Sequence, residues 1–146
     1  MSGTEILHVG RVGEASLLKI ATNMISAVTV ETLSEAYGLV AAAGIEPAKL
    51  QEAISVNACR SNLSAMKLPT IIEQNYEPHF SLKNMFKDSQ LALSLAKSLG
   101  IELPALTTTA NIMFRTIQEG DGDHDYSILA KKYQESAEDK TGKEER

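Results

Sequence analysis

GRVGEASLLKIATNMISAVTVETLSEAYGLVAAAG, residues 10–44, is the stretch that decides the fold of this chain. It opens with a glycine turn and then continues to Gly44 without proline and with one further glycine, Gly38. At ~1.5 Å per residue, this stretch predicts a helix of roughly 45 Å. Beyond its first turn, the charged residues are Lys19, Glu31 and Glu35. A helix that is apolar almost all round is either buried at the centre of a domain or covered by a partner subunit.

Lys19 and Asn23 are four positions apart, so they lie on one face of the expected helix, with Ser26 a turn further on. Periodicity alone favours a simple interpretation, in which Lys19 reaches solvent past the helix end and Asn23 faces solvent. The alternative is that Lys19 is buried for a chemical reason, because burying a lysine is costly. A lysine acts as a base near neutrality only when burial or neighbouring charges lower its pKa.

Three motifs occur in order along the chain. They are Gly10-x-x-Gly13-x-Ala15-x-x-x-Lys19-x-x-x-Asn23, then Phe80 with Lys87-Asp88-Ser89-Gln90-Leu91-Ala92-Leu93, then Gly120-Asp121-Gly122-Asp123-x-Asp125-x-Ser127. Together they resemble the β-hydroxyacid dehydrogenases, a family that includes 3-hydroxyisobutyrate dehydrogenase, tartronate semialdehyde reductase and the glyoxylate/succinic semialdehyde reductases. The resemblance covers roughly residues 7–133, and Ala15 stands where the family pattern usually has a third glycine.

The resemblance implies an all-α fold of the 6-phosphogluconate-dehydrogenase-like C-terminal type, built around one long central helix. It implies an oxidoreductase that uses NAD or NADP to interconvert a small hydroxyacid and its aldehyde or keto acid. In that setting Lys19 is the catalytic proton donor and acceptor, and Asn23 holds the substrate or the lysine. Lys87 and Phe80 face the cofactor, and Asp88 supports the substrate site. Without the resemblance, Lys87 and Asp88 are a solvated surface pair and Phe80 is a core residue.

The domain organisation follows from what the chain contains and lacks. No Gly-x-Gly-x-x-Gly follows a strand and opens a helix, and no βαβ alternation occurs, so a nucleotide-binding Rossmann domain is not expected here. Residues 1–9 are expected to connect from such a domain, residues 10–134 to form a helical substrate-binding and dimerisation domain, and residues 135–146 to be a charged, disordered tail. By itself, the chain is expected to be inactive.

About six helices are expected, with no competing strand pattern. After the long helix they are predicted at residues 49–58, 63–74, 81–99, 107–118 and 128–138. A helix of roughly 45 Å is too long for a compact monomer of this size to cover. The chain is therefore expected to form a homodimer or homotetramer.

Composition narrows the possible partners. The chain is 43% hydrophobic, with a formal net charge of −5, which argues against nucleic acid or an anionic membrane as the main partner. There is one cysteine, Cys59, and neither a signal peptide nor an apolar run long enough for a membrane span, so a cytoplasmic location is expected. No metal is expected, because the histidines are dispersed. The aspartates from Asp121 onward do not form an EF-hand, since position twelve would be Lys132.

A second hypothesis of a different class stays open. The chain could be a non-catalytic helical protein-interaction module that retains the fold but not the activity. The missing nucleotide-binding half and Ala15 favour this alternative, whereas the presence of Lys19, Asn23, Lys87 and Asp88 favours the dehydrogenase.

Overall fold

The computed structural model describes residues 10–144, and within that range it contains helices and no strand. The elements are α1 (Glu14–Ala42), α2 (Pro47–Val56), α3 (Asn62–Ile72), α4 (Leu82–Ser98), α5 (Pro104–Thr116), the π-helical η1 (Ile117–Asp121), the 3₁₀-helical η2 (Tyr126–Ala130) and α6 (Lys131–Glu144). The all-α class is confirmed. The expected connecting segment, residues 1–9, lies outside the described residues.

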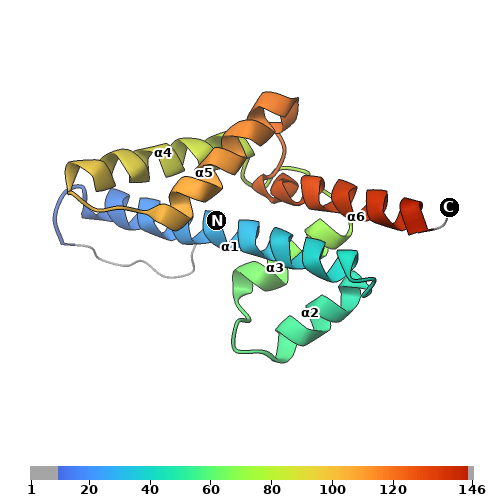
Figure 1. The fold of residues 1–146 in the computed structure, drawn as a ribbon. Coiled ribbons are helices and arrows are strands. Elements are labelled where there is room, and N and C mark those ends of the chain that lie inside the picture. Colours follow the sequence, from blue (N-terminus) through green and yellow to red (C-terminus); the bar gives the residue numbers. More distant parts are fainter. Residues whose placement is uncertain (1–9, 145–146) are drawn as a thin grey trace.

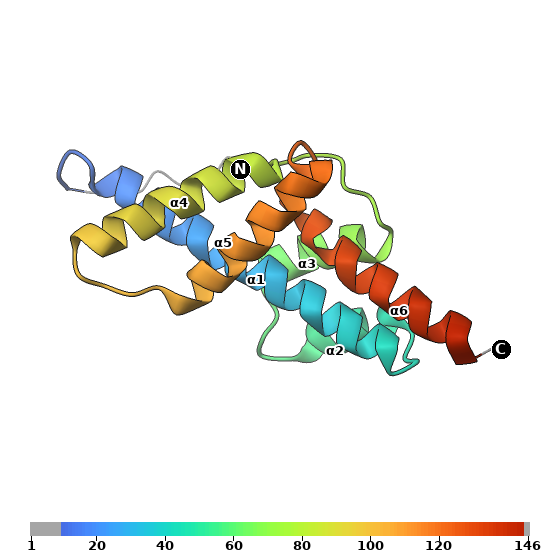
Figure 2. The same cartoon turned by 45° about the horizontal axis from the view of Figure 1, so that its top comes forward.

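Helix α1 is the axis of the molecule. It begins after Gly13, whose positive φ of 95° is a conformation that glycine adopts without steric cost. Helices α4 and α5 lie along its N-terminal half, and α2, α3 and α6 surround its C-terminal half (Figures 1 and 2). One long helix therefore connects the two parts of the domain.

The core forms where α1 meets its neighbours. The larger cluster joins Ala27 and Val30 of α1 to α4, α5 and η2, and its other buried members are Leu82, Met85, Ala92, Leu106, Ile112, Met113, Tyr126, Ile128 and Leu129. A smaller cluster joins Leu33 and Tyr37 to Ile71 and Ala130. The buried members that α1 contributes to the two clusters begin at Ala27, near the middle of the helix, so the first turns of α1 lie at the edge of the packed region.

The sequence predicted that α1 is either buried in the domain or covered by a partner subunit, and within this chain its buried residues begin only at Ala27. Among the described residues of α1, none before Ala27 is buried. Leu17, Leu18 and Ile25 are exposed. A helix of apolar composition is expected to pack against other elements, but α4 and α5 lie along only one side of this half of α1.

The prediction of a disordered tail is contradicted by helix α6, which continues to Glu144, so that residues 135–144 are helical. Its first turn is held by Gln134, whose Nε2 donates to the Ile71 carbonyl at 2.7 Å and whose Oε1 accepts from the Tyr76 hydroxyl at 2.5 Å. Tyr133 donates from its hydroxyl to Glu31 of α1. Lysine and glutamate have good helix propensity, so a helix anchored at this end continues through the charged sequence.

Gly38 sets the closest approach of α1 and α6. A Cβ at this position would lie 2.8 Å from the Tyr133 Cβ, so Gly38→Ala is expected to force the helices apart and lower the free energy of unfolding by about 1–3 kcal/mol. Gly122→Ala is the matched control, because its Cβ would meet Ile117 at an ordinary 3.5 Å. Chemical denaturation measures both changes, and equal stabilities of the two variants would contradict the expectation.

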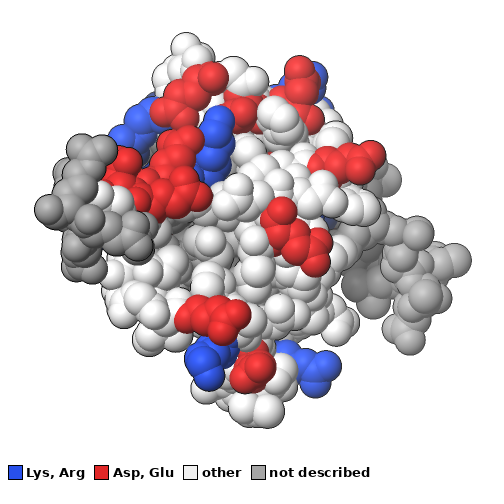
Figure 3. Space-filling view, turned by 90° about the vertical axis from the view of Figure 1, so that its right-hand side faces the viewer, with Lys and Arg blue, Asp and Glu red and all other residues white. Residues whose placement is uncertain are grey.

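The end of the molecule on the right of Figure 1 carries dispersed charge. In Figure 3, acidic and basic side chains surround a largely uncharged area, and the described residues on this face form no continuous basic surface of the kind that binds nucleic acid. Within residues 10–144, none of the helices is both long enough and apolar enough to cross a membrane.

Candidate active site

Three of the predicted site residues meet between α1 and α4. Asn23 Nδ2 donates to Asp88 Oδ2 at 2.7 Å, and Lys19 Nζ lies 3.9 Å from the same oxygen. The helical repeat places Lys19 and Asn23 on one face of α1, and the packing of α4 on that face brings in Asp88. One carboxylate oxygen therefore contacts both residues that the sequence assigned to catalysis.

A cavity of about 440 Å³ opens beside this group. Its wall comes from α1, α3, the 79–80 turn, α4 and η2, and the lining residues are Lys19, Thr22, Asn23, Ser26, Met66, Lys67, His79, Phe80, Met85 and Tyr126. The α1 side supplies the cationic, amide and hydroxyl groups, whereas Phe80, Met85 and Tyr126 supply apolar surface. Such a mixture of apolar wall and few polar groups is typical of a small-molecule site.

The predicted cofactor-facing residues separate in the structure. Phe80 lines the cavity, and its ring meets the Tyr126 ring edge-on, with centroids 6.3 Å apart. Lys87 is exposed on α4 and is not among the residues that line this cavity. Adjacent positions on a helix point about 100° apart, so the burial of Asp88 turns Lys87 outward.

The exposure of Lys19 agrees with the interpretation that periodicity alone favours, in which this side chain reaches solvent. Its side chain is 69% exposed, whereas that of Asp88 is 8% exposed. The described residues therefore do not provide the burial that the alternative interpretation requires. Lys19 nevertheless lines the cavity, from the N-terminal half of α1.

Sequence reasoning missed Lys67, the second lysine of the cavity. Its Nζ donates to both oxygens of Asp125, at 2.8 and 3.0 Å, and the two side chains are 3% and 2% exposed. The helical repeat of the sequence did point to this residue, because Lys67 shares the buried face of α3 with Ser64, Leu68 and Ile71. A charged residue on an apolar helical face predicts a buried partner, although the pattern cannot identify it.

Asp125, which belongs to the third motif, caps η2 by accepting from the Ser127 N–H at 3.0 Å. It also accepts from the Ser127 hydroxyl and from the backbone N–H groups of His79 and Phe80. Burial acts to raise the pKa of this carboxyl. The hydrogen bonds from Lys67, Ser127 and Phe80 outweigh burial and hold the pKa below its ordinary value.

The alternating aspartates each pair with a different cation. Asp121 contacts Lys131 and His124, Asp123 pairs with Lys83, and Asp125 pairs with Lys67. Among the residues that the structure describes, no group of three or more His, Cys, Asp and Glu side chains could hold a metal ion.

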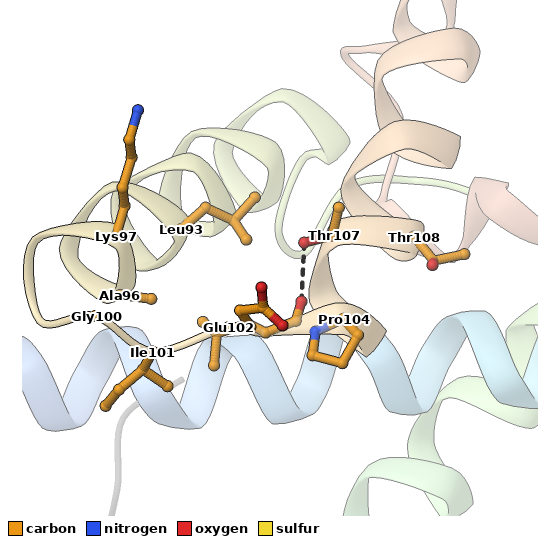
Figure 4. A pocket seen from close by; sticks show the side chains of 10 residues that line it. Leu93, Ala96, Lys97, Gly100, Ile101, Glu102, Pro104, Thr107 and Thr108 are labelled. Atoms are coloured by element: carbon orange, nitrogen blue, oxygen red, sulfur yellow. Dashed lines mark hydrogen bonds between the residues drawn. The ribbon is translucent and has the colours of Figure 1, made fainter.

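A larger hollow, of about 650 Å³, lies at the α4–α5 connection (Figure 4). Leu93, Ala96, Ile101 and Pro104 give it an apolar wall, and Lys97 points away from it. The Thr107 hydroxyl donates to the Leu103 carbonyl at 2.9 Å, so this polar group is used locally. None of the predicted site residues lines this hollow, and the smaller cavity is the candidate site.

The fold and site together define a helical domain in which a lysine and an asparagine on one helix face a buried aspartate. Residues 13–133 match the family described as "NAD-binding of NADP-dependent 3-hydroxyisobutyrate dehydrogenase". The chain belongs to this family of β-hydroxyacid dehydrogenases, whose cofactor is NAD or NADP.

Individual relatives carry names of two kinds, a nuclear factor and a reductase. The chain is 33% identical over 123 residues to the cytokine-like nuclear factor N-PAC of Anopheles gambiae, an alignment that covers 84% of this chain and 22% of the relative. It is 31% identical to the chloroplastic glyoxylate/succinic semialdehyde reductase 2 of Arabidopsis thaliana, with 87% of this chain and 36% of the relative covered.

The fold is shared with a solved structure. The crystal structure of 3-hydroxyisobutyrate dehydrogenase from Salmonella typhimurium matches with a TM-score of 0.76 and 26% identity, over 80% of this chain and 41% of that one. The chain thus spans less than half the length of each of these proteins.

Proposed function

We propose that this chain is the helical substrate-binding and dimerisation domain, residues 10–134, of an NAD(P)-dependent β-hydroxyacid dehydrogenase. The whole enzyme interconverts a small hydroxyacid and its aldehyde or keto acid. The observation that carries this proposal is the contact of both Lys19 and Asn23 with one oxygen of Asp88 at the edge of a cavity.

The chemistry of oxidation requires the loss of a hydride from carbon and of a proton from the alcohol oxygen. Bound NAD or NADP supplies the hydride chemistry. Lys19 handles the proton, because its neutral amine accepts it during oxidation and its ammonium donates it during reduction. Asn23 can both donate to and accept from a substrate oxygen, and its bond to Asp88 orients the amide. Phe80, Met85 and Tyr126 keep the opposite wall of the cavity apolar.

The residues present fit the reactive end of such a cofactor and not its phosphates. Phe80 offers an aromatic edge beside the cavity. Residues 10–144 contain no strand, and therefore no strand–glycine-turn–helix unit of the kind that holds a pyrophosphate. We therefore assign phosphate binding to a separate Rossmann domain, which would also cover the exposed face of Lys19. Lys87 is exposed, so a role toward the cofactor depends on that domain.

The alternative function is a non-catalytic interaction module. The specific observation in its favour is the 33% identity to a protein named a cytokine-like nuclear factor. A fold can be retained after its activity is lost, so the site must decide between the two. The Lys19–Asn23–Asp88 contacts favour the enzyme, because a module without catalysis has no need of them.

The test is turnover by the full-length protein that carries this sequence. The purified protein is incubated with NAD or NADP and a panel of small hydroxyacids, and with the reduced cofactors and semialdehydes. Reduction or oxidation of the nicotinamide is followed by absorbance. Turnover that depends on Lys19 supports the proposal, whereas a folded protein without turnover on any member of the panel favours the interaction module.

We propose a cytoplasmic location for the enzyme.

Self-association is the second part of the proposal. The uncovered half of α1 presents Leu17, Leu18 and Ile25, and an apolar hollow of about 360 Å³ lies beside Ile25 and Pro104. Surface of this kind is typical of an interface between subunits.

The chain is expected to sediment as a dimer or tetramer at micromolar concentration, and Ile25→Glu is expected to give a monomer because it places a charge in the interface. Val56→Glu on α2 is the control, because Val56 is even more exposed, at 88% against 62%. A wild-type chain that sediments as a stable monomer would contradict this part of the proposal.

A further inference from the structure

Lys67 lines the cavity and pairs with Asp125, yet neither side chain takes part in the chemistry described above. Both oxygens of Asp125 accept from Lys67, and Lys67 Nζ also lies 4.6 Å from the centroid of the Tyr126 ring. Lys67 and Tyr126 both line the cavity. A buried charge pair is therefore built into the wall of the site.

Stability alone does not account for a buried pair. Taking two charges out of water is costly, and a well-packed apolar pair of similar size is often at least as stabilising. The role of the pair must then be sought in the other hydrogen bonds that Asp125 accepts. Asp125 Oδ2 accepts from the backbone N–H of His79 at 3.1 Å and of Phe80 at 3.2 Å. These are the residues of the turn that enters the cavity wall.

Backbone hydrogen bonds also join these two segments, residues 76–82 and 124–126. The Asp125 N–H donates to the Tyr76 carbonyl at 2.9 Å, and the Tyr126 N–H donates to the Phe80 carbonyl at 3.0 Å. The Leu82 N–H donates to the His124 carbonyl at 2.8 Å. These bonds fix the start of α4, the helix that carries Asp88.

We propose that Lys67 is a positioning residue of the site. By balancing the buried charge of Asp125, it lets that carboxylate hold the His79–Phe80 turn against the cavity. The consequence for catalysis rests on the proposed dehydrogenase function, whereas the effect on the turn does not. A carboxylate without this counter-charge takes up a proton or water, and in either case loses acceptor capacity for the two amides.

Backbone hydrogen exchange tests the effect on the turn. In Lys67→Met, which keeps an unbranched apolar stem, the amides of His79 and Phe80 are expected to exchange about tenfold faster or more, because bonds to a charged acceptor are weakened. Lys83→Met is the matched control. Lys83 of α4 pairs with Asp123, two residues before Asp125, but in solvent, with side chains 59% and 84% exposed. Native-like protection of His79 and Phe80 in Lys67→Met would overturn the inference.

Two further variants keep the test decisive if Lys67→Met does not fold. Lys67→Arg retains the charge and is expected to keep the protection. The double variant Lys67→Met/Asp125→Asn contains no buried charge and is expected to fold. Its amide has one acceptor oxygen, which cannot serve both the turn amides and the Ser127 N–H, and a neutral oxygen is a weaker acceptor than a charged one, so exchange at the turn stays fast. Native protection in this folded double variant would equally overturn the inference.

Kinetics of the full-length protein test the consequence for the site. A displaced turn is expected to raise KM about tenfold while kcat changes little, because Lys19 is untouched. An unchanged KM in a variant that has lost protection at the turn would overturn the positioning role. A wild-type protein without turnover would instead refute the proposed function, and the exchange experiment would still decide whether Lys67 holds the turn.

Discussion

Replacing Lys19 with alanine is expected to lower turnover of the full-length protein by about 10²–10⁴-fold, the usual contribution of a positioned acid–base group. The motivation is the position of Lys19 at the cavity, with its Nζ 3.9 Å from Asp88 and Asn23 on the same helical face. The loss is expected in kcat and kcat/KM together, because proton transfer contributes in the transition state. Steady-state kinetics across pH, with thermal melts, provide the measurement.

Further variants distinguish a loss of proton transfer from a loss of positive charge and from a loss of folding. Lys19→Arg is expected to fail almost as badly, because a guanidinium stays protonated. Asn23→Ala is expected to be milder and to show partly as weaker substrate binding. Lys97→Ala is the control, since Lys97 is an exposed lysine of α4 that does not line this cavity. The fold should survive Lys19→Ala because the side chain is largely exposed. Near-normal turnover in a folded Lys19→Ala protein would remove the catalytic assignment.

Replacing Asp125 with alanine is expected to cost about 3–5 kcal/mol in the free energy of unfolding. The change leaves Lys67 charged and buried, and it removes the acceptor of the His79 and Phe80 amides. Urea denaturation of the chain near neutral pH measures the loss. Asp123→Ala is the matched control two residues away, because its pair with Lys83 is exposed and exposed pairs contribute little. Similar losses in the two variants would contradict the expectation.

The same carboxylate predicts how stability depends on pH. The folded-state pKa of Asp125 is lower than its unfolded value of about 3.9, so its contribution is fully present above that unfolded value. The contribution is lost as the pH falls from there through the folded-state pKa. The wild-type chain should therefore lose more stability than Asp125→Ala on acidification below about pH 4. Denaturation curves at several acidic pH values test this, and parallel losses in both proteins would refute it.

Much of the site was accessible from the sequence because its spacing is local. A repeat of 3.6 residues is sufficient to place Lys19 and Asn23 on one face of a helix. The long proline-free stretch predicted α1, and Gly13 marked its start. The motif around Asp88 carried a third site residue, which the structure brings to within 2.7 Å of Asn23. Local patterns therefore predicted the all-α class and the central helix, and the family resemblance identified three of the residues that meet.

The tertiary structure alone decided how these parts are covered and connected. Lys67 and Asp125 are 58 positions apart, and no periodicity links residues at that distance. The exposure of Lys19 depends on which side of α1 faces α4 and α5, since these two helices lie along one side of its N-terminal half. Helix α6 continues through a charged sequence because Gln134 anchors it to Ile71 of α3. Periodicity reports which face of a helix is apolar, whereas burial and pairing depend on which other elements pack against that face.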